Sequence, residues 1–572
     1  MIFPRIDSIP FGDFAFLDNR TDTAAPRDWS SWATHAALIL LLLYFGYVYR
    51  GAMFITEGVM ERDGFYHARY AQMLPERGLS RALPWMQFAD WKDHFCDKDF
   101  LYHVYLAAFT RDAVEPLPGA KYGTLLLLLA TLGAIYVVLR KWDAPFALLW
   151  VALAGVGSAH FLMRMFMIRS HCFSVLLMVV ATHVILSRRF WPCFAIAFVY
   201  SWSYSVPLAM LITACAAEFG RFIVERDWKA SARVPLATGA GLLAGLTIHP
   251  YTPYSLKSVW MILEIIRSGS MGSDVELGTE FQRMTLDSAF TVSIGTSLAA
   301  LAVLVGGVAL LKGAFKNRKL APETAALVAV STAWFVIMFV SFQRFIEYSA
   351  PLTCLAGGLV VRDMLGPLPP LWKVEEGRRT AFISAAGVAA LALVALHTWT
   401  LELNRRNIEI FSNPSLPLDP RERTDQIARI WYRGRFFDGA AQWMREKLKP
   451  GTVVANFYWD DFPELFYSAP EMYYLAGLDP TLMRLEHREK ALALEAMRVK
   501  ELPAGQKPPG HAPIDFAAMN ELFGTDYTIL RRYRAAKYAE LFDASSKQLK
   551  REAANGKIVY EDNEAVIYFY KK

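Results

Sequence analysis

The chain has 572 residues, of which 54% are hydrophobic and 14% aromatic, while only 20% are charged. The apolar residues are concentrated in long blocks before about residue 400, a distribution that argues against an ordinary cytosolic protein. The formal net charge of +6 therefore bears on loop orientation at a membrane, and we expect no nucleic-acid partner. The five cysteines are scattered, so neither a disulfide framework nor a metal knuckle is predicted.

Residues 1–30 mix Phe and Pro with Asp and Arg, and they lack the basic start, short apolar core and cleavage site of a signal peptide. We interpret them as a leader. Residues 31–400 then contain eleven apolar blocks, several of which approach the roughly 20 residues that cross a bilayer. We therefore predict an α-helical polytopic membrane domain of about eleven spans, surrounded by membrane lipids. The predicted spans are 32–49, 122–139, 146–163, 170–187, 191–204, 205–219, 234–249, 290–311, 322–341, 348–361 and 380–397.

Basic residues fall on every second connection between these blocks, which the positive-inside rule places in the cytoplasm. These connections contain Arg140 and Lys141, Arg188 and Arg189, and the basic residues of 221–233, 312–319 and 362–379. The parity puts the N-terminus inside. It puts the loops at 50–120 and 250–289, and the tail after residue 400, outside. We expect a multi-pass protein of a bacterial inner or plasma membrane.

The first external loop begins with the stretch ERDGFYHARY, in which Asp63 follows the first span. A carboxylate beside ring and cationic groups can hold a divalent cation or take a proton from a nucleophile. We therefore take Asp63 as a catalytic candidate, with His67 and Arg69 as substrate-binding candidates. The alternative is that Asp63 caps a short amphipathic helix, predicted over 63–79 and ended near Gly78.

The same loop carries a second acidic group, Asp97 and Asp99, followed by His103. Two carboxylates at this spacing can coordinate a metal, or a sugar-phosphate through a metal. The alternative is a solvated acidic turn balanced by nearby lysines. If the first reading holds, both carboxylates assist Asp63 and His103 contacts substrate.

Charged residues also interrupt apolar stretches near span boundaries, where they are costly unless they face a cavity or a partner. Arg344 and Glu347 in SFQRFIEYSAP are the main pair, and Arg164, Arg169 and His249 lie at the same predicted level. All five are substrate-binding candidates. Arg344 and Glu347 could instead form an ion pair one helical turn apart, or Arg344 could extend its stem to reach water.

The external loop at 250–289 contains GSDVELGTEFQR, with Glu276 and Glu280. It is polar, rich in glycine and long enough to act as a mobile cover over a site. A solvated acidic loop is the alternative.

After residue 400 the pattern changes to alternating helices and strands, which predicts a soluble α/β domain over 401–572. We expect a helix over 437–451, a strand over 452–459, a strand in TDYTILRRY and a closing hairpin turned at Asp562 and Asn563. A further group of candidates follows the first strand. Trp459, Asp460 and Asp461 would suit a sugar or a hydroxyl-bearing acceptor, or else Trp459 packs in the core and Asp460 caps a helix.

Three of these stretches resemble motifs of GT-C fold glycosyltransferases, especially oligosaccharyltransferase catalytic subunits. RDGFYHAR is similar to their Asp-containing first external loop, QRFIEY resembles the stretch with a lipid-phosphate-binding Arg, and NFYWDDFPELFY resembles their Trp-Trp-Asp motif. The resemblance implies a GT-C-like fold and transfer from a polyprenyl-phosphate-linked donor. It also implies that Asp63 is the base or metal carboxylate and that Arg344 clamps the lipid phosphate.

The chain departs from that family at two places. The second Asp-x-Asp of oligosaccharyltransferases would fall near 159–171, where AHFLMRMFMIRSH has Arg and His but no acid, and Tyr458 replaces the first Trp of the tail motif. A basic patch there suits a phosphate better than a cation. We therefore expect only a loosely held Mg or Mn ion on Asp63, Asp97 and Asp99.

The resulting hypothesis is a membrane glycosyltransferase that transfers a sugar or oligosaccharide at the extracytoplasmic face to a glycan, lipid or protein acceptor. An oligosaccharyltransferase acting on proteins is one alternative. A non-enzymatic lipid or glycan transporter is another, and it predicts inverted repeats and charges at the bilayer midplane. We see no repeat in the sequence, and the acidic candidates cluster at one face.

Overall fold

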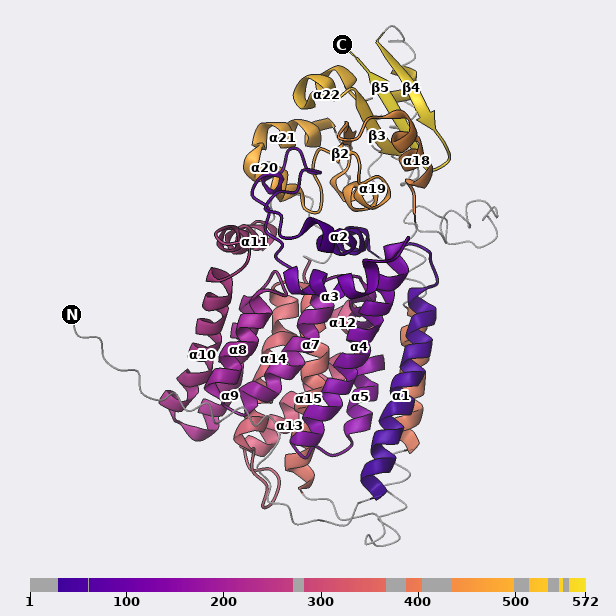
Figure 1. Ribbon diagram of the computed structural model, residues 1–572. Coiled ribbons are helices and arrows are strands. Elements are labelled where there is room, and N and C mark those ends of the chain that lie inside the picture. The colour runs from indigo at the N-terminus through magenta and orange to yellow at the C-terminus, as the bar shows by residue number, and fades with distance from the viewer. Residues whose placement is uncertain are drawn as a thin grey trace, which may run out of the picture.

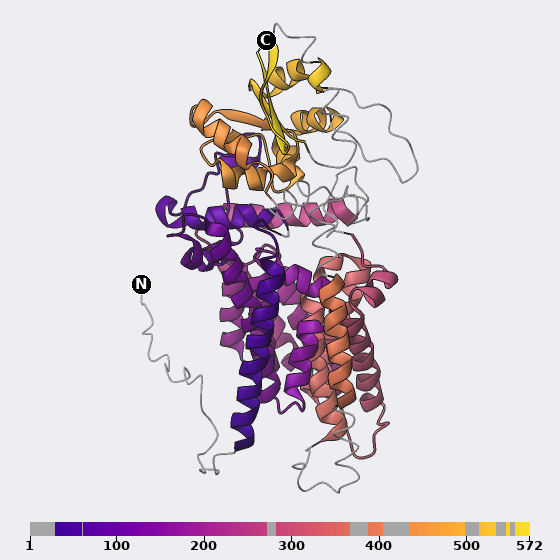
Figure 2. The ribbon, with the colours of Figure 1, turned by 90° about the vertical axis from the view of Figure 1, so that its right-hand side faces the viewer.

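The computed structural model describes residues 29–59, 61–270, 282–366, 387–403, 435–497, 514–532, 545–548 and 555–571. A bundle of long helices makes up most of the molecule, and a small sheet domain lies at one end of it (Figure 1). Two helices, α2 (Asp63–Arg77) and α11 (Tyr254–Ser270), run crosswise between the bundle and the sheet domain (Figure 2).

The bundle is built from helices that coincide with the predicted apolar blocks. They are α1 (Trp29–Met53), α4 (Pro116–Lys141), α5 (Ala147–Val156), α6 (Ala159–Phe166), α7 (His171–Leu186), α8 (Phe190–Ser201), α9 (Leu208–Glu225), α10 (Trp228–Thr247), α13 (Ile294–Leu311), α14 (Pro322–Val340), α15 (Ile346–Leu365) and a helix over Gly387–Leu403. The shorter helices before the tail are α3 (Phe100–Thr110), α12 (Leu286–Thr291), η1 (Asp90–Lys92) and η3 (Gln343–Phe345).

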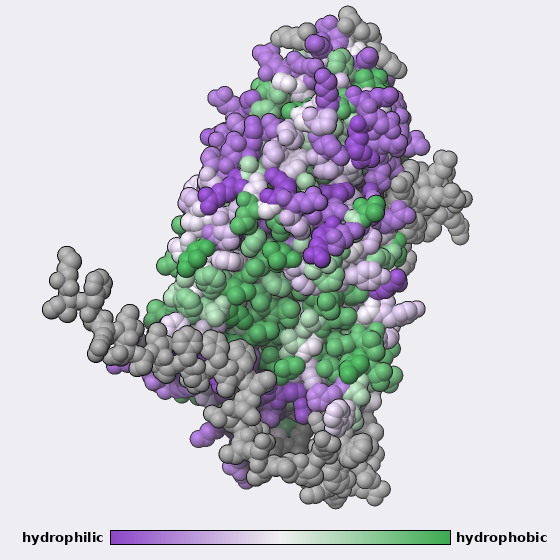
Figure 3. All heavy atoms as spheres, in the orientation of Figure 1, coloured by the Kyte–Doolittle hydropathy of each residue, from purple (hydrophilic) through white to green (hydrophobic). Residues whose placement is uncertain are grey.

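On the face shown in Figure 3, an apolar belt crosses the bundle, between a mainly polar sheet domain and polar residues toward the opposite end. Among the described residues, four helices are long and apolar enough to cross a membrane, or five if the bent pair α5 and α6 is one span. The chain is therefore an integral membrane protein. The count of about eleven spans is not confirmed, because α7, α8 and the helix over Gly387–Leu403 are apolar but shorter.

The predicted span at 146–163 is broken into α5 and α6, which meet at 75°. Gly157 gives its carbonyl to the Thr296 amide, at 3.0 Å, instead of continuing the helix. Ser158 then starts α6, because its Oγ accepts from the Phe161 amide at 3.0 Å. The break tilts α6, and with it Arg164, across the bundle.

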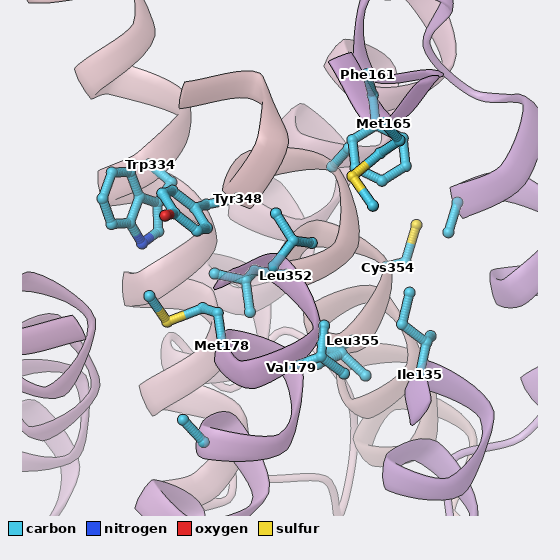
Figure 4. Packing of buried hydrophobic residues seen from close by; sticks show 14 of the residues in the cluster. Ile135, Phe161, Met165, Met178, Val179, Trp334, Tyr348, Leu352, Cys354 and Leu355 are labelled. Atoms are coloured by element: carbon cyan, nitrogen blue, oxygen red, sulfur yellow. The ribbon is translucent and has the colours of Figure 1, made fainter. Parts of the chain in front are cut away.

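The bundle core is close-packed around α7, α14 and α15. Figure 4 shows Trp334 of α14 beside Tyr348 of α15, with ring centroids 4.8 Å apart, and Met178 of α7 facing the same core. Leu352 and Leu355 continue the buried face of α15. Such packing fixes the ends of these helices, from which the charged candidates project.

The tail is a small α/β domain, as predicted, and it contains one mixed sheet. Its strands are β1 (Val453–Asn456), β2 (Tyr473–Tyr474), β3 (Tyr527–Arg531), β4 (Gly556–Glu561) and β5 (Ala565–Tyr570), in the order β2-β1-β3-β5-β4. β1 pairs in parallel with β2 and β3, and β5 pairs antiparallel with β3 and β4. Its helices are α18 (Asp438–Lys447), η6 (Trp459–Asp461), α19 (Phe462–Ser468), α20 (Pro480–Glu486), α21 (Arg488–Met497) and α22 (Phe516–Phe523).

Two expectations for the tail met different outcomes. The hairpin of β4 and β5 turns where predicted, because Asp562 Oδ1 accepts from the amides of Glu564 and Ala565, both at 2.7 Å. The strand predicted over 452–459 was too long and ends at Asn456. There the Asn456 side chain donates to the carbonyls of Tyr458 and Ala476 and so bends the chain into η6.

The loop at 50–120 and the tail lie at the same end of the bundle, as predicted (Figure 1). The loop adds an extended segment to the edge of the sheet: the Gln87 amide donates to the Tyr474 carbonyl at 2.9 Å, and the Tyr474 amide donates to the Trp85 carbonyl at 2.8 Å. That this end is extracytoplasmic stays a prediction.

Candidate functional site

Helix α2 begins directly beside the bundle, which places Asp63 at the junction of bundle and tail. Its buried face carries Phe65, Tyr66, Tyr70 and Leu74, and it ends at Gly78, whose positive φ of 63° suits a glycine. At the start, a Cβ on Gly64 would lie 3.1 Å from Val59 and 3.3 Å from Ile168. The glycine after Asp63 therefore lets the helix start approach the segment that carries Arg169.

The Asp63 carboxylate forms an ion pair with Arg169, with Oδ2 and Nη2 2.5 Å apart. The Arg169 Nε also lies 3.6 Å from Glu61 Oε2. The N-cap position of α2 is Arg62, so Asp63 occupies the first turn, where its charge is favoured by the helix dipole. Side chains of Asp63 and Arg169 are 14% and 20% exposed, so a ligand could reach either.

A second buried chain of polar groups joins Asp97, His103 and His67. Both carboxylate oxygens of Asp97 lie 2.8 and 2.9 Å from His103 Nδ1, and His103 Nε2 lies 2.8 Å from His67 Nδ1. A carboxylate only accepts, so His103 donates from Nδ1 and presents its other nitrogen to His67. Burial, reinforced by His103, lowers the pKa of His67 well below its ordinary value.

Asp99 is also buried rather than part of a solvated turn. Burial by itself would raise the pKa of Asp99, but the charge of Lys98 leads the contributions that lower it, to about 2. Lys98 Nζ lies 3.1 Å from its Oδ2. Within the described ranges, no group of three or more His, Cys, Asp or Glu side chains is arranged to hold a metal ion. The metal role of Asp63, Asp97 and Asp99 therefore stays a prediction.

The charges at the bundle end form one connected network. Glu347 is fully buried in the first turn of α15 and lies 3.0 Å from Arg164 Nη2 of α6. Its other oxygen accepts from the Tyr204 hydroxyl at 2.9 Å, and Arg344 Nη2 donates to that hydroxyl at 2.9 Å. Glu347 thus contacts Arg164 directly and is linked to Arg344 through Tyr204.

Arg164 and Arg169 belong to the basic stretch at 164–171, and each already faces a carboxylate: Glu347 for Arg164 and Asp63 for Arg169.

The tail contributes its Trp-Asp-Asp turn to the same junction. Arg62 Nη1 lies 2.9 Å from Asp461 Oδ1 and 3.4 Å from Asp460 Oδ2. Asp461 also lies 2.6 Å from Arg531 of β3, inside the tail. The side chain of Asp461 makes no capping hydrogen bond to α19. Its carboxylate links the loop at 50–120 to the tail, because it contacts Arg62 of the loop and Arg531 of β3.

Trp459 lies within the tail domain. It lines a small cavity of the tail together with Met483, Ala491 and Leu494, which come from α20 and α21. The cavity wall is mainly apolar, which fits the interpretation of Trp459 as part of the tail interior.

Two further predicted residues hold elements together. Arg69 donates to the Tyr467 carbonyl at 2.9 Å and lies over the Tyr467 ring, which ties α2 to α19. His249 is buried against Trp202 and Tyr251. Glu276 and Glu280 lie outside the described residues.

Four residues of this site were missed from the sequence. Arg62 and Glu61 stand within the motif around Asp63 but were not singled out. Tyr204 is one tyrosine among many in an apolar region, and Arg531 ends an ordinary strand, so neither has a local signal. Only their contacts with Glu347 and Asp461 reveal them.

No protein-family model matches the chain, and no curated protein is similar to it in sequence. Solved structures are similar in fold. The Archaeoglobus fulgidus oligosaccharyltransferase, tethered to an acceptor peptide with the NVT sequon, has a TM-score of 0.57 and 13% identity, over 95% of this chain and 75% of that one.

A second similar structure is covered over nearly its whole length. ArnT from Cupriavidus metallidurans, bound to undecaprenyl phosphate, has a TM-score of 0.53 and 13% identity over 94% of this chain and 98% of that one, and its apo form has a TM-score of 0.52. The chain has the GT-C fold. This GT-C protein thus shares its architecture, a helical bundle with a tail domain over one end, with the two enzymes. The resemblance seen in three short motifs is confirmed at the level of the fold.

Proposed function

We propose that the protein is a membrane glycosyltransferase that takes a sugar or oligosaccharide from a polyprenyl-phosphate carrier and transfers it at the extracytoplasmic face. The observation that carries the proposal is the partly exposed Asp63 carboxylate, held by Arg169 where bundle and tail meet. The GT-C fold supports the reaction class. ArnT with bound undecaprenyl phosphate supports a polyprenyl carrier.

The proposed reaction is a displacement at the anomeric carbon of the donor sugar. The acceptor nucleophile forms a bond to that carbon while the bond from carbon to phosphate oxygen breaks, and the polyprenyl phosphate leaves with the electron pair. Asp63 takes the proton that the nucleophile loses. Arg169 holds the carboxylate in place through its Nη2.

The leaving phosphate needs a positive group, and Arg344 is the candidate at the bundle end. Arg344 is half-buried, unlike the fully buried Arg164, and its Nη2 donates to the Tyr204 hydroxyl. Planar guanidinium groups suit bidentate contact with phosphate oxygens.

The acceptor is a glycan, a lipid or a protein. The Archaeoglobus enzyme carries an acceptor peptide, which favours a protein acceptor as one alternative. In this chain, however, Asp460 and Asp461 bind Arg62, and Trp459 lines a tail cavity. We therefore propose no sequon-like recognition and leave the acceptor to experiment.

The test uses the full chain in lipid nanodiscs with polyprenyl-phosphate-linked sugars and a panel of sugar, lipid and peptide acceptors. Mass spectrometry should detect free polyprenyl phosphate together with a glycosylated acceptor, and the Asp63→Asn variant should produce far less of both. An intact donor with every acceptor, or movement of the carrier across vesicles without transfer, would reject the proposal in favour of a transporter.

A further inference from the structure

Arg344 Nη2 donates to the hydroxyl of the buried Tyr204, at 2.9 Å. We propose that Tyr204 is a positioning residue: it holds the Arg344 guanidinium in the pose that receives the carrier phosphate, with Glu347 and Arg164 fixing Tyr204 in turn. This inference rests on the proposed function and adds a determinant of carrier binding.

The series of contacts that leads to Arg344 begins at the buried ion pair of Arg164 and Glu347. Both side chains are almost fully buried, 2% and 0% exposed, and they join α6 to α15 across 183 positions of sequence. Arg164 uses Nε as well as Nη2 on the same carboxylate oxygen, at 3.3 and 3.0 Å. Removing either charge would leave the opposite charge buried without its ion-pair partner, which is costly.

Arg164 contacts Oε2 of Glu347, and Tyr204 donates to the other carboxylate oxygen, Oε1. A tyrosine hydroxyl has one proton to donate, and Glu347 Oε1 accepts it at 2.9 Å. The hydroxyl oxygen must therefore act as an acceptor toward its other partner, which is Arg344 Nη2 at 2.9 Å. The carboxylate of Glu347 can only accept, so it determines the donor and the acceptor in both hydrogen bonds of Tyr204.

Tyr204 lies outside the helices and packs against neighbouring aromatic rings. It lies in the connection between α8 and α9, and it is buried, with its ring near those of Tyr200 and Tyr348. A flexible Arg side chain loses rotamer freedom when it binds a phosphate, and a contact that has already restricted it lowers that loss. Tyr204 thus contributes to affinity without touching the lipid.

The experiment compares Tyr204→Phe with the matched control Tyr200→Phe. Tyr200 bonds to the Tyr348 hydroxyl at 2.8 Å and is equally buried, so both variants lose one hydroxyl from the same aromatic cluster. Tyr204→Phe leaves the ion pair of Arg164 and Glu347 in place. We therefore expect both variants to fold and to melt within a few degrees of the wild type.

Affinity for polyprenyl monophosphate in nanodiscs is the readout. We expect Tyr204→Phe to raise Kd roughly 3- to 10-fold, an effect of the size that ordering one long side chain produces. Tyr200→Phe should change it less than about 2-fold, because it removes no contact of Arg344. In an Arg344→Met background Tyr204→Phe should add almost nothing, since a positioning residue has no effect without the group it positions.

The outcomes separate the two proposals. Equal effects of the two Phe variants, or an undiminished effect of Tyr204→Phe in the Arg344→Met background, would overturn the positioning role while binding and transfer by the wild type still supported the proposed function. A wild type that neither binds the carrier lipid nor transfers sugar would reject both.

Discussion

Asp63 and Arg169, 106 positions apart in the chain, form an ion pair with Oδ2 and Nη2 2.5 Å apart at the junction between the helical bundle and the tail. Arg169 stands in the segment where the resemblance to oligosaccharyltransferases would place a second acid. The carboxylate of Asp63 therefore faces a guanidinium within its own chain, and any substrate or cation that binds it competes with Arg169.

The first prediction concerns Asp63. Asp63→Asn keeps the shape and a hydrogen-bond acceptor for Arg169 but removes the charge that accepts a proton. We expect single-turnover transfer to fall by about 10² to 10⁴, the usual worth of a general base, while carrier Kd changes little. Glu61→Gln, which contacts the same Arg169, is the control and should retain most activity. Wild-type rates from a folded Asp63→Asn protein would remove Asp63 from the reaction.

The second prediction concerns Arg344. Arg344→Lys keeps a positive charge but loses the planar fork, so carrier Kd should rise about 10-fold and the transfer rate should fall with it. Lipid binding and single-turnover transfer are measured on the same purified protein. A purely structural role predicts the opposite pattern: lower yield or a lower Tm in detergent, with normal binding by the protein that folds.

The third prediction concerns a buried acid of the tail. Glu464 accepts from the Phe437 amide at 3.0 Å, and burial raises the pKa of its carboxyl from 4.5 to about 7. Between these values the folded protein keeps a proton that the unfolded chain has lost. Stability should therefore fall as pH rises from about 4.5 to 7, by up to about 3 kcal/mol, and stay low above pH 7.

Thermal unfolding of the full chain in detergent at several pH values tests this. Glu464→Gln cannot ionise, so the difference in Tm between this variant and the wild type should change across that window. Glu446→Gln, an exposed change on α18, is the control and should follow the wild type. Parallel pH profiles for Glu464→Gln and the wild type would show that Glu464 does not titrate in this range.

The fourth prediction concerns the divalent cation. Because Arg169 already occupies Asp63, a Mg or Mn ion there would be held loosely, and a chelator should reduce sugar transfer reversibly. Activity is measured after chelation and again after each ion is returned. Full activity in metal-free buffer would leave Asp63 with the role of base alone.

The fifth prediction concerns topology. The alternation of basic connections places the tail outside, so a reporter active only in the cytoplasm should be silent when fused after Lys572. The same reporter inserted between α13 and α14, within residues 312–319, should be active. Strong activity from the C-terminal fusion would reverse the orientation and move the site to the cytoplasmic face.

The sequence alone determined the features that depend on neighbouring residues. The apolar blocks predicted where helices lie, Gly78 marked the end of α2, and Asp562 marked the turn between β4 and β5. Each of these is decided by local hydropathy or by a backbone conformation that few residues adopt, so a short window of sequence is sufficient.

The tertiary structure alone decided which charges meet. Glu347 binds Arg164 from 183 positions away, and Arg62 binds Asp461 across 399. A charge in an apolar stretch must find a partner, but the pattern does not say which one, because the choice depends on where helices cross and how the tail docks. Tyr204 carries no local signal at all, and its link to Arg344 exists only because a loop and a helix start come together in space.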